Sequence, residues 1–222
     1  MSDLIQLCAR LSAAVYNGFM PDDQGIWHWQ RISCEQTDTF AIACVTQDAV
    51  IIAVQGSESR RDWLNNFRII KTEYHGIKAH KGFAWAAESI LADVLKVISR
   101  EPGKQIIFTG HSLGGAIATL LAVAMRPLPV KVITFGAPRV STKRELNLAL
   151  YGEYVRVVNG SDVVPRSPWL AYSHAGTLVY LSNSGKHIVD ANPLTMFWDR
   201  LPTIFDRATD HSMRHYLQEL TA

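Results

Sequence analysis

The chain has 222 residues, of which 48% are hydrophobic and 19% charged, and its formal net charge is +2. This length suits one α/β domain with a substantial core, so we expect residues 1–222 to form a single domain. A near-neutral charge without a basic run argues against nucleic acid as a partner. No apolar run reaches the roughly 18 residues of a membrane span, so no transmembrane segment is expected.

The amino-terminal stretch predicts an amphipathic helix from Ser2 or Asp3 to about Tyr16. Charged side chains interrupt its apolar pattern and no basic segment precedes it, so it does not resemble a signal peptide. We therefore expect a cytoplasmic protein. Secretion by a signal-less route, or after removal of a leader, remains open.

Three β-rich runs follow, and polar turns between them favour a meander at the start of a mixed sheet. These runs are 27–34, 39–46 and 49–55. The three cysteines cannot form a closed disulfide framework. Cys34 and Cys44 could face each other across a hairpin, but we interpret both, together with Cys8, as buried thiols.

From residue 105 onward, predicted strands and helices alternate, which favours a parallel sheet covered on both faces. The predicted strands here are 105–109, 130–135, 154–158 and 177–181, and the predicted helices are 116–125, 142–150 and 210–220; a further helix, 82–98, is predicted before them. The expected fold class is therefore α/β, with a central sheet that is mostly parallel but mixed and helices on both faces.

The stretch 105–125 predicts a strand, a sharp turn and a buried helix. The turn has the sequence GHSLGG at 110–115, which fits the G-x-S-x-G nucleophile elbow in the context that this motif requires. The glycines let strand and helix approach closely, and the helix start offers backbone N–H groups to a developing oxyanion. Ser112 is therefore the predicted nucleophile. His111, next to it on the turn, is expected to serve packing or hydrogen bonding.

A serine nucleophile needs a base, and the base needs an acid to orient it. Asp162 follows the predicted strand 154–158 through a short turn, at the carboxyl end where site groups gather in an open α/β sheet. The order serine, acid, histidine leaves four candidates for the base: His174, His187, His211 and His215.

His211 is the preferred base because it lies where a loop joins the last predicted helix, and His215 is the alternate. We interpret the other two candidates as structural or pocket-lining. His211 and His215 also form H-x-x-x-H, but without an evident third ligand we expect no metal and no cofactor.

Several spaced motifs resemble the fungal-type class 3 lipase family, which has the α/β-hydrolase fold. The matching stretches are VQGS at 54–57, Trp63, HKGF at 80–83, the elbow at 110–115, TFGAPR at 134–139, 157–165, YSHAG at 172–176 and Asp210-His211. The resemblance implies hydrolysis of acylglycerol-like esters, with Ser112 as nucleophile, Asp162 as acid and His211 as base. It also implies an oxyanion hole formed by Ser57 and the backbone N–H of Leu113. From the residues alone, Ser57 is equally well a turn serine.

Two apolar segments are candidates for contact with lipid. In residues 59–72, Trp63, Phe67 and Ile70 form one apolar helical face, which suits a lid that opens at a lipid surface. A short helix docked on the core is the equal alternative. The segment 194–205 either lines an acyl site or simply packs on the core.

We expect a serine carboxylic ester hydrolase that cleaves acyl esters of glycerolipids through an acyl-enzyme. Its substrate would be an acylglycerol or a phospholipid, with transient contact to a lipid surface. Phospholipase A1, a short-chain carboxylesterase and acyl transfer to another alcohol remain open. A catalytically silent module that binds lipid or protein is the alternative from another class, and the presence of all three triad residues argues against it.

Overall fold

An eight-stranded mixed sheet forms the centre of the protein, with strand order β1-β2-β3-β6-β7-β8-β9-β10. The computed structural model describes residues 2–18, 25–56, 70–160, 162–168, 170–200 and 211–221. The sheet strands are β1 (His28–Cys34), β2 (Thr39–Val45), β3 (Ala49–Val54), β6 (Gln105–His111), β7 (Val130–Phe135), β8 (Gly152–Asn159), β9 (Thr177–Leu181) and β10 (His187–Val189). From β3 to β9 neighbouring strands are parallel, and antiparallel pairs flank them at both edges. The predicted mostly parallel, mixed sheet is confirmed.

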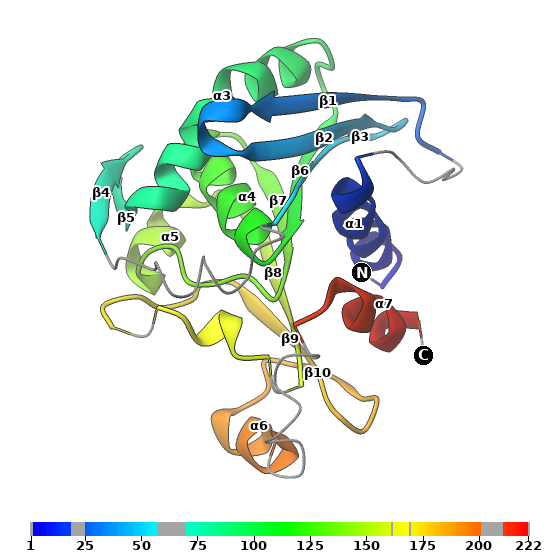
Figure 1. Cartoon of the computed structure of the whole chain (residues 1–222), viewed down its shortest axis with the longest axis vertical. Helices are drawn as coiled ribbons and strands as arrows, with labels where there is room; N and C mark the ends of the chain where they lie inside the picture. Colours follow the sequence, from blue (N-terminus) through cyan, green and yellow to red (C-terminus); the bar gives the residue numbers. More distant parts are fainter. Residues whose placement is uncertain are drawn as a thin grey trace.

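Helices cover both faces of this sheet (Figure 1). On one face lie α3 (Lys81–Ser99) and α4 (Leu113–Ala124), which share a hydrophobic cluster with the sheet. On the other face lie α1 (Ser2–Ala14) and α7 (Met213–Thr221), which share a second cluster. The first and last helices therefore pack on the same side of the sheet, and the two ends of the chain lie close together in Figure 1.

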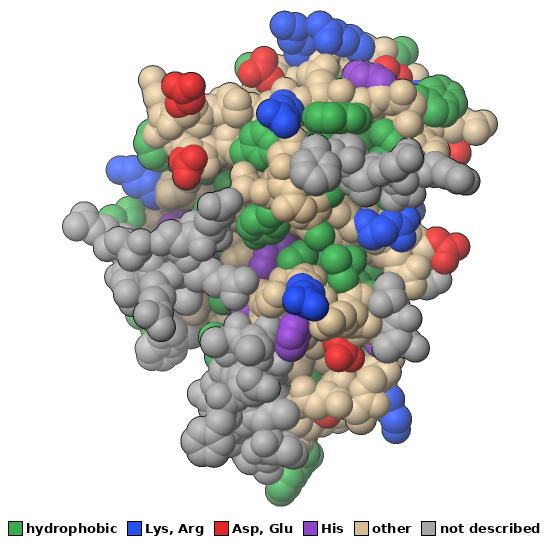
Figure 2. All heavy atoms as spheres, turned by 45° about the vertical axis from the view of Figure 1, so that its right-hand side comes forward, with side chains coloured by type: hydrophobic (Ala, Val, Ile, Leu, Met, Phe, Trp, Pro, Cys, Tyr) green, Lys and Arg blue, Asp and Glu red, His purple; other side chains and the backbone are tan. Residues whose placement is uncertain are grey.

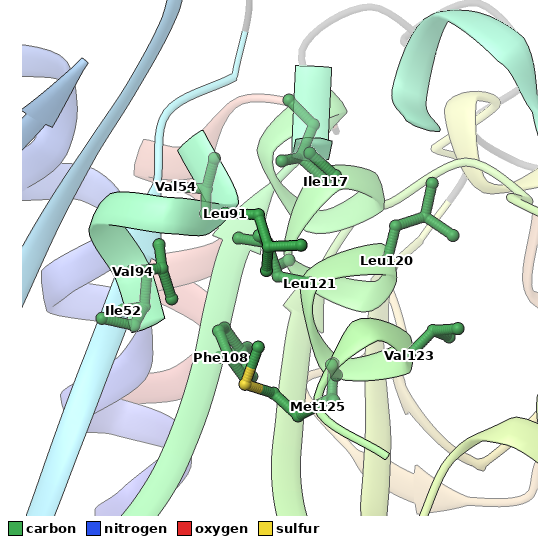
Figure 3. Close-up of a cluster of buried hydrophobic side chains, with 14 of the residues drawn as sticks. Ile52, Val54, Leu91, Val94, Phe108, Ile117, Leu120, Leu121, Val123 and Met125 are labelled. Atoms are coloured by element: carbon green, nitrogen blue, oxygen red, sulfur yellow. The ribbon is translucent and has the colours of Figure 1, made fainter. Parts of the chain in front are cut away.

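The helix α4 is apolar all round because it packs between the sheet and α3. Its side chains meet Phe108 of β6 and Leu91 and Val94 of α3 in the cluster drawn in Figure 3. A helix buried this completely cannot shift without disturbing the core. The residue that joins β6 to α4 is consequently held between two rigid elements.

The helix predicted for residues 59–72 does not include residues 70–72. Ile70 is exposed and lies outside any helix, and its carbonyl accepts a hydrogen bond from the backbone N–H of Lys81 at 2.8 Å. Immediately after it, β4 (Lys71–Tyr74) and β5 (Ile77–His80) form a hairpin. Trp63, Phe67 and Ser57 lie outside the described residues, so their roles stay predictions.

The hairpin β4–β5 was missed because its strands have only four residues each and carry little apolar alternation. Its two turn residues, His75 and Gly76, have φ of 42° and 82°. Such left-handed pairs are the usual connection of a tight hairpin. Among the described residues, the other short elements are α5 (Lys143–Ala149), α6 (Pro193–Arg200) and the 3-10 helices η1 (Val15–Asn17), η2 (Glu35–Thr37) and η3 (Val164–Arg166).

The hairpin register separates two of the cysteines. Cys34 pairs with Thr39 and Cys44 with Trp29, so the two thiols do not face each other. Cys8 and Cys44 are buried, and burial raises the pKa of each thiol to about 12, whereas Cys34 is only half-buried. The prediction of three buried thiols is therefore wrong for Cys34. Among the described residues, no helix is long and apolar enough to cross a membrane.

Replacing a fully buried core side chain should destabilise the protein strongly. Phe108→Ala is expected to lower the free energy of unfolding by about 3–5 kcal/mol, since the surrounding strands and α4 cannot collapse into the cavity. Leu148→Ala is the control: Leu148 on α5 is 64% exposed, so a change within about 0.5 kcal/mol is expected. Urea unfolding measures both. Equal, small changes would contradict the assigned core.

Candidate active site

Ser112 lies on the single-residue turn between β6 and α4. Its backbone has φ 57° and ψ −127°, and its N–H donates to the carbonyl of Phe135 at 2.9 Å. A non-glycine residue at positive φ stores strain, and strain of this kind is concentrated at functional sites. The turn holds the serine at the carboxyl end of β6, at the start of the buried helix.

Two glycines make this turn possible. A Cβ on Gly110 would lie 2.5 Å from the carbonyl carbon of Gly114, and a Cβ on Gly114 would lie 2.1 Å from the carbonyl oxygen of Val54. Strand and helix thus approach more closely than any side chain permits, as the pattern G-x-S-x-G requires.

The structure brings Ser112, His211 and Asp162 into one hydrogen-bonded chain, although they lie far apart in the sequence. The Ser112 hydroxyl is 2.8 Å from Nε2 of His211. Nδ1 of His211 is 2.8 Å from Oδ2 and 3.0 Å from Oδ1 of Asp162. Because a carboxylate only accepts, Nδ1 carries the proton and Nε2 is left to accept the serine proton. All three residues are buried.

The Asp162 carboxylate is held by two further donors. The hydroxyl of Tyr216 donates to Oδ2 at 2.7 Å, and the backbone N–H of Val164 donates to Oδ1 at 2.9 Å. The same tyrosine oxygen accepts from the backbone N–H of Asn159 at 3.0 Å. Tyr216 therefore ties α7 to the end of β8. Tyr216 was not predicted from the sequence, because a tyrosine on the apolar face of a helix looks like an ordinary packing residue.

His111 supports the triad histidine by contacting its backbone carbonyl and its ring. Its Nε2 donates to the backbone carbonyl of His211 at 2.7 Å, and its ring lies 4.6 Å from the His211 ring. Since Nε2 carries the proton in the neutral ring, Nδ1 accepts from the hydroxyl of Tyr16 at 2.9 Å. His111 thus connects α1, through Tyr16, to the backbone of His211.

A groove between α1 and α7 lies beside Tyr16 and His111. It has a volume of about 620 Å³ and is lined by Tyr16 and His111, among others, but not by Ser112. Figure 2 shows this side of the molecule, where hydrophobic, basic and histidine side chains lie near one another at the centre of the view.

The remaining predicted residues are found away from the hydrogen-bonded chain. His215 is half-buried on α7, one turn beyond His211. Nε2 of His187 donates to the carbonyl of Glu219 at 2.9 Å, and Nε2 of His174 donates to that of Pro165 at 2.6 Å. Burial, with the positive charge of Arg156 second, lowers the pKa of His174 to about 3.

Leu113 is the first residue of α4, so its backbone N–H has no acceptor within the helix. It lies at the positive end of the helix dipole, directly beside Ser112. This is the position expected for an oxyanion donor.

The described residues contain no group of three or more His, Cys, Asp or Glu side chains that could hold a metal ion.

The sequence model of the family described as lipase (class 3) matches residues 51–172, more than half of the chain. The chain belongs to this family. The matched part includes the elbow and Asp162, and it ends before His211. The resemblance inferred from the spaced motifs is confirmed.

Individual class 3 lipases resemble the chain over most of its length. A secreted mono- and diacylglycerol lipase of Fusarium solani is 31% identical over 65% of this chain and 45% of its own length. One of Penicillium cyclopium is 28% identical over 71% of this chain and 57% of its own length. The chain thus spans about half the length of these curated relatives.

Solved lipase structures share the fold. The lipase of Rhizopus microsporus var. chinensis superposes with a TM-score of 0.78 at 21% identity, covering 95% of this chain and 85% of that one. A triacylglycerol lipase, described as having a serine protease triad as its catalytic centre, superposes at 0.71 and 25% identity, covering 84% and 82%. The predicted α/β-hydrolase fold is confirmed.

The comparison with sequence relatives contradicts the expected cytoplasmic location, because the Fusarium and Penicillium relatives are named as secreted lipases. The physical basis of that expectation was the amphipathic first helix. In the structure α1 contributes to the hydrophobic cluster on its face of the sheet. A helix that is part of the core carries no information about the compartment.

Gly136 should tolerate no side chain, because its φ is 57° and a Cβ would lie 2.7 Å from Oδ2 of Asp162. Gly185→Ala is the matched control, since Gly185 has φ of 75° and open space around it. The control should lose about 1–2 kcal/mol of unfolding free energy from backbone strain alone. Gly136→Ala should lose about 1–3 kcal/mol more, from the clash. Equal losses in urea unfolding would mean that the space beside Asp162 is not restricted.

His174 should make the fold sensitive to acid. In the unfolded chain it takes up a proton near its ordinary pKa of 6.5, but in the folded chain only near 3. Between these values the unfolded state binds more protons, so stability falls as the pH is lowered. In thermal unfolding between pH 7 and 4.5, His174→Gln should show a shallower fall than the wild type. Parallel curves would contradict the lowered pKa.

Proposed function

We propose that the chain is a serine carboxylic ester hydrolase that cleaves acyl esters of glycerolipids. The hydrogen-bonded chain Ser112–His211–Asp162 at the carboxyl end of the sheet carries this proposal. The family and the names of the Fusarium and Penicillium relatives support acylglycerols as the substrate class. Because these relatives are named as secreted, secretion is part of the proposal.

In the proposed mechanism, Nε2 of His211 takes the hydroxyl proton of Ser112 as Oγ attacks the ester carbonyl carbon. The imidazolium then gives this proton to the leaving alcohol, and the acyl group remains on Oγ. A water molecule, deprotonated by His211 in turn, attacks the acyl carbonyl carbon, and the imidazolium returns the proton to Oγ of Ser112 as the fatty acid leaves. Asp162 holds the proton-bearing Nδ1 towards itself and stabilises the imidazolium that forms in each half of the reaction.

The negative charge that develops on the carbonyl oxygen needs donors. In the proposal the backbone N–H of Leu113 is one of them, since it lies next to the nucleophile at a helix start. Ser57 is the second proposed donor, and Trp63 and Phe67 remain a proposed lid. These three residues rest on the family resemblance and their sequence pattern alone.

Removing the nucleophile or the base should abolish turnover without unfolding the protein. Ser112→Ala and His211→Ala are expected to lower kcat on a soluble p-nitrophenyl ester several thousand-fold or more, because triad members act as a unit. His215→Ala is the matched control on the same helix and should keep most of the activity. A fluorophosphonate should label the wild type stoichiometrically and leave Ser112→Ala unlabelled.

Normal turnover in Ser112→Ala would remove the proposed mechanism, and an equal loss in His215→Ala would undermine the choice of base. Rates on emulsified acylglycerols, phosphatidylcholine vesicles and a short monomeric ester then distinguish a lipase from a phospholipase A1 or a plain carboxylesterase. Labelling without turnover on any ester would instead favour a binding module.

A further inference from the structure

The short helix α6 carries its apolar side chains on the outside of the protein. Leu194, Phe197 and Trp198 are 64%, 55% and 62% exposed. They occupy positions i, i+3 and i+4, so they share one face of the helix. The rings of Phe197 and Trp198 also contact each other edge to face, with centroids 5.6 Å apart. In Figure 1, α6 lies at one end of the molecule beyond β9 and β10, apart from both helical layers.

The half-buried side of α6 carries Met196 and Asp199, and hydrogen bonds anchor Asp199. Oδ2 of Asp199 accepts from the hydroxyl of Tyr180 at 2.7 Å and from the backbone N–H of Asn183 at 3.1 Å. The side-chain amide of Asn183 donates to the carbonyl of Asp199 at 2.7 Å. At the other end, Oδ1 of Asn192 accepts from the N–H of Thr195 at 2.8 Å. Hydrogen bonds therefore hold the helix on the β9–β10 end of the sheet.

This arrangement departs from the usual orientation of a surface helix. An amphipathic helix of a globular protein normally turns its apolar face towards the core. Here only Met196 and Asp199 are half-buried, while three larger apolar side chains, Leu194, Phe197 and Trp198, face water. Clustered side chains of this kind mark a surface that meets another apolar phase or partner.

The helix is also attached to the segment that leads to the triad acid. The Tyr180 hydroxyl, which bonds Asp199, lies 3.2 Å from the carbonyl oxygen of Gly160. Gly160 precedes Asp162 by two residues, and Tyr180 has no exposed surface. One buried side chain thus contacts both α6 and the segment that carries the triad acid.

We propose that the apolar face of α6, formed by Leu194, Phe197 and Trp198, is a lipid-contact surface that enters the boundary of aggregated substrate. This inference rests on the proposed function, because it supposes that the reacting ester is held in a lipid phase. The face projects from the molecule and carries a tryptophan, which suits shallow insertion at a membrane interface.

A lipid boundary fits this face better than a protein partner does. A standard protein interface needs roughly 800 Å² from each partner, and three side chains on an eight-residue helix supply only a small part of that. A lipid surface demands no matching shape and rewards each apolar side chain that leaves water. Its contact with α6 would also hold the rest of the protein, including the triad, beside the phase that contains the ester.

The test compares matched exposed residues on different faces. Phe197→Ser with Trp198→Ser removes most of the apolar face, and Leu194→Ser tests it singly. Trp85→Ser on α3 and Leu148→Ser on α5 are the controls, because Trp85 is 60% and Leu148 64% exposed. Sedimentation with vesicles of ether-linked phosphatidylcholine, which holds no carboxylic ester, measures binding. Rates on an emulsified acylglycerol and on a monomeric p-nitrophenyl ester complete the comparison.

The double variant should bind vesicles about tenfold or more weakly and lose emulsion activity in proportion, while its kcat/KM on the monomeric ester stays unchanged. The controls should match the wild type in all three measurements. Equal losses on both substrates, equal losses in the controls, or no vesicle binding by the wild type would overturn the proposal. A wild type that binds vesicles but hydrolyses no ester would contradict the proposed function and leave the lipid contact standing.

Discussion

A buried carboxylate constrains the arrangement of the whole site. Asp162 has no exposed surface, and an ionised carboxylate in such a position requires donors on all sides. Its donors come from His211, from Tyr216 of α7 and from the backbone of Val164. The end of β8 and the last helix must therefore meet at one point. If α7 moved away, the carboxylate would lose its tyrosine and its histidine together.

The two hydrophobic layers supply the rigidity that this meeting requires. On one face, the buried helix α4 holds the strained turn at Ser112 against the end of β6. On the other, α1 and α7 pack together, and Tyr16 of α1 reaches the His211 backbone through His111. The nucleophile and the base are thus held from opposite faces of the sheet and meet at the carboxyl ends of its strands. Tyr180 also bonds to Asp199 of α6, whose apolar side chains form an outer surface.

Much of the fold follows from patterns that are local in the sequence. Apolar runs bounded by polar turns predicted the strands, because a strand buried on both faces cannot be polar. GHSLGG predicted the sharp turn, since only glycine permits the close approach at Gly110 and Gly114. Chain order and strand ends indicated Asp162 and His211. The hairpin β4–β5 was missed because four-residue strands carry too little periodicity, and the helical reading of Ile70 was wrong for the same reason.

The sequence by itself indicated the mostly parallel sheet and the elbow, because each depends on residue types at short, regular spacing. It predicted Asp162 and His211 from chain order and strand ends, with His215 as the alternate base. Only the tertiary structure decided which side chains support them. Tyr216, Tyr16 and His111 act through contacts between segments about a hundred residues or more apart, or through a helix face whose neighbour is unknown beforehand. The orientation of α6 was likewise beyond the sequence. Its pattern of Leu194, Phe197 and Trp198 is that of a helix packed on a core, but in the structure Asp199 is bonded to the protein and those three side chains face water.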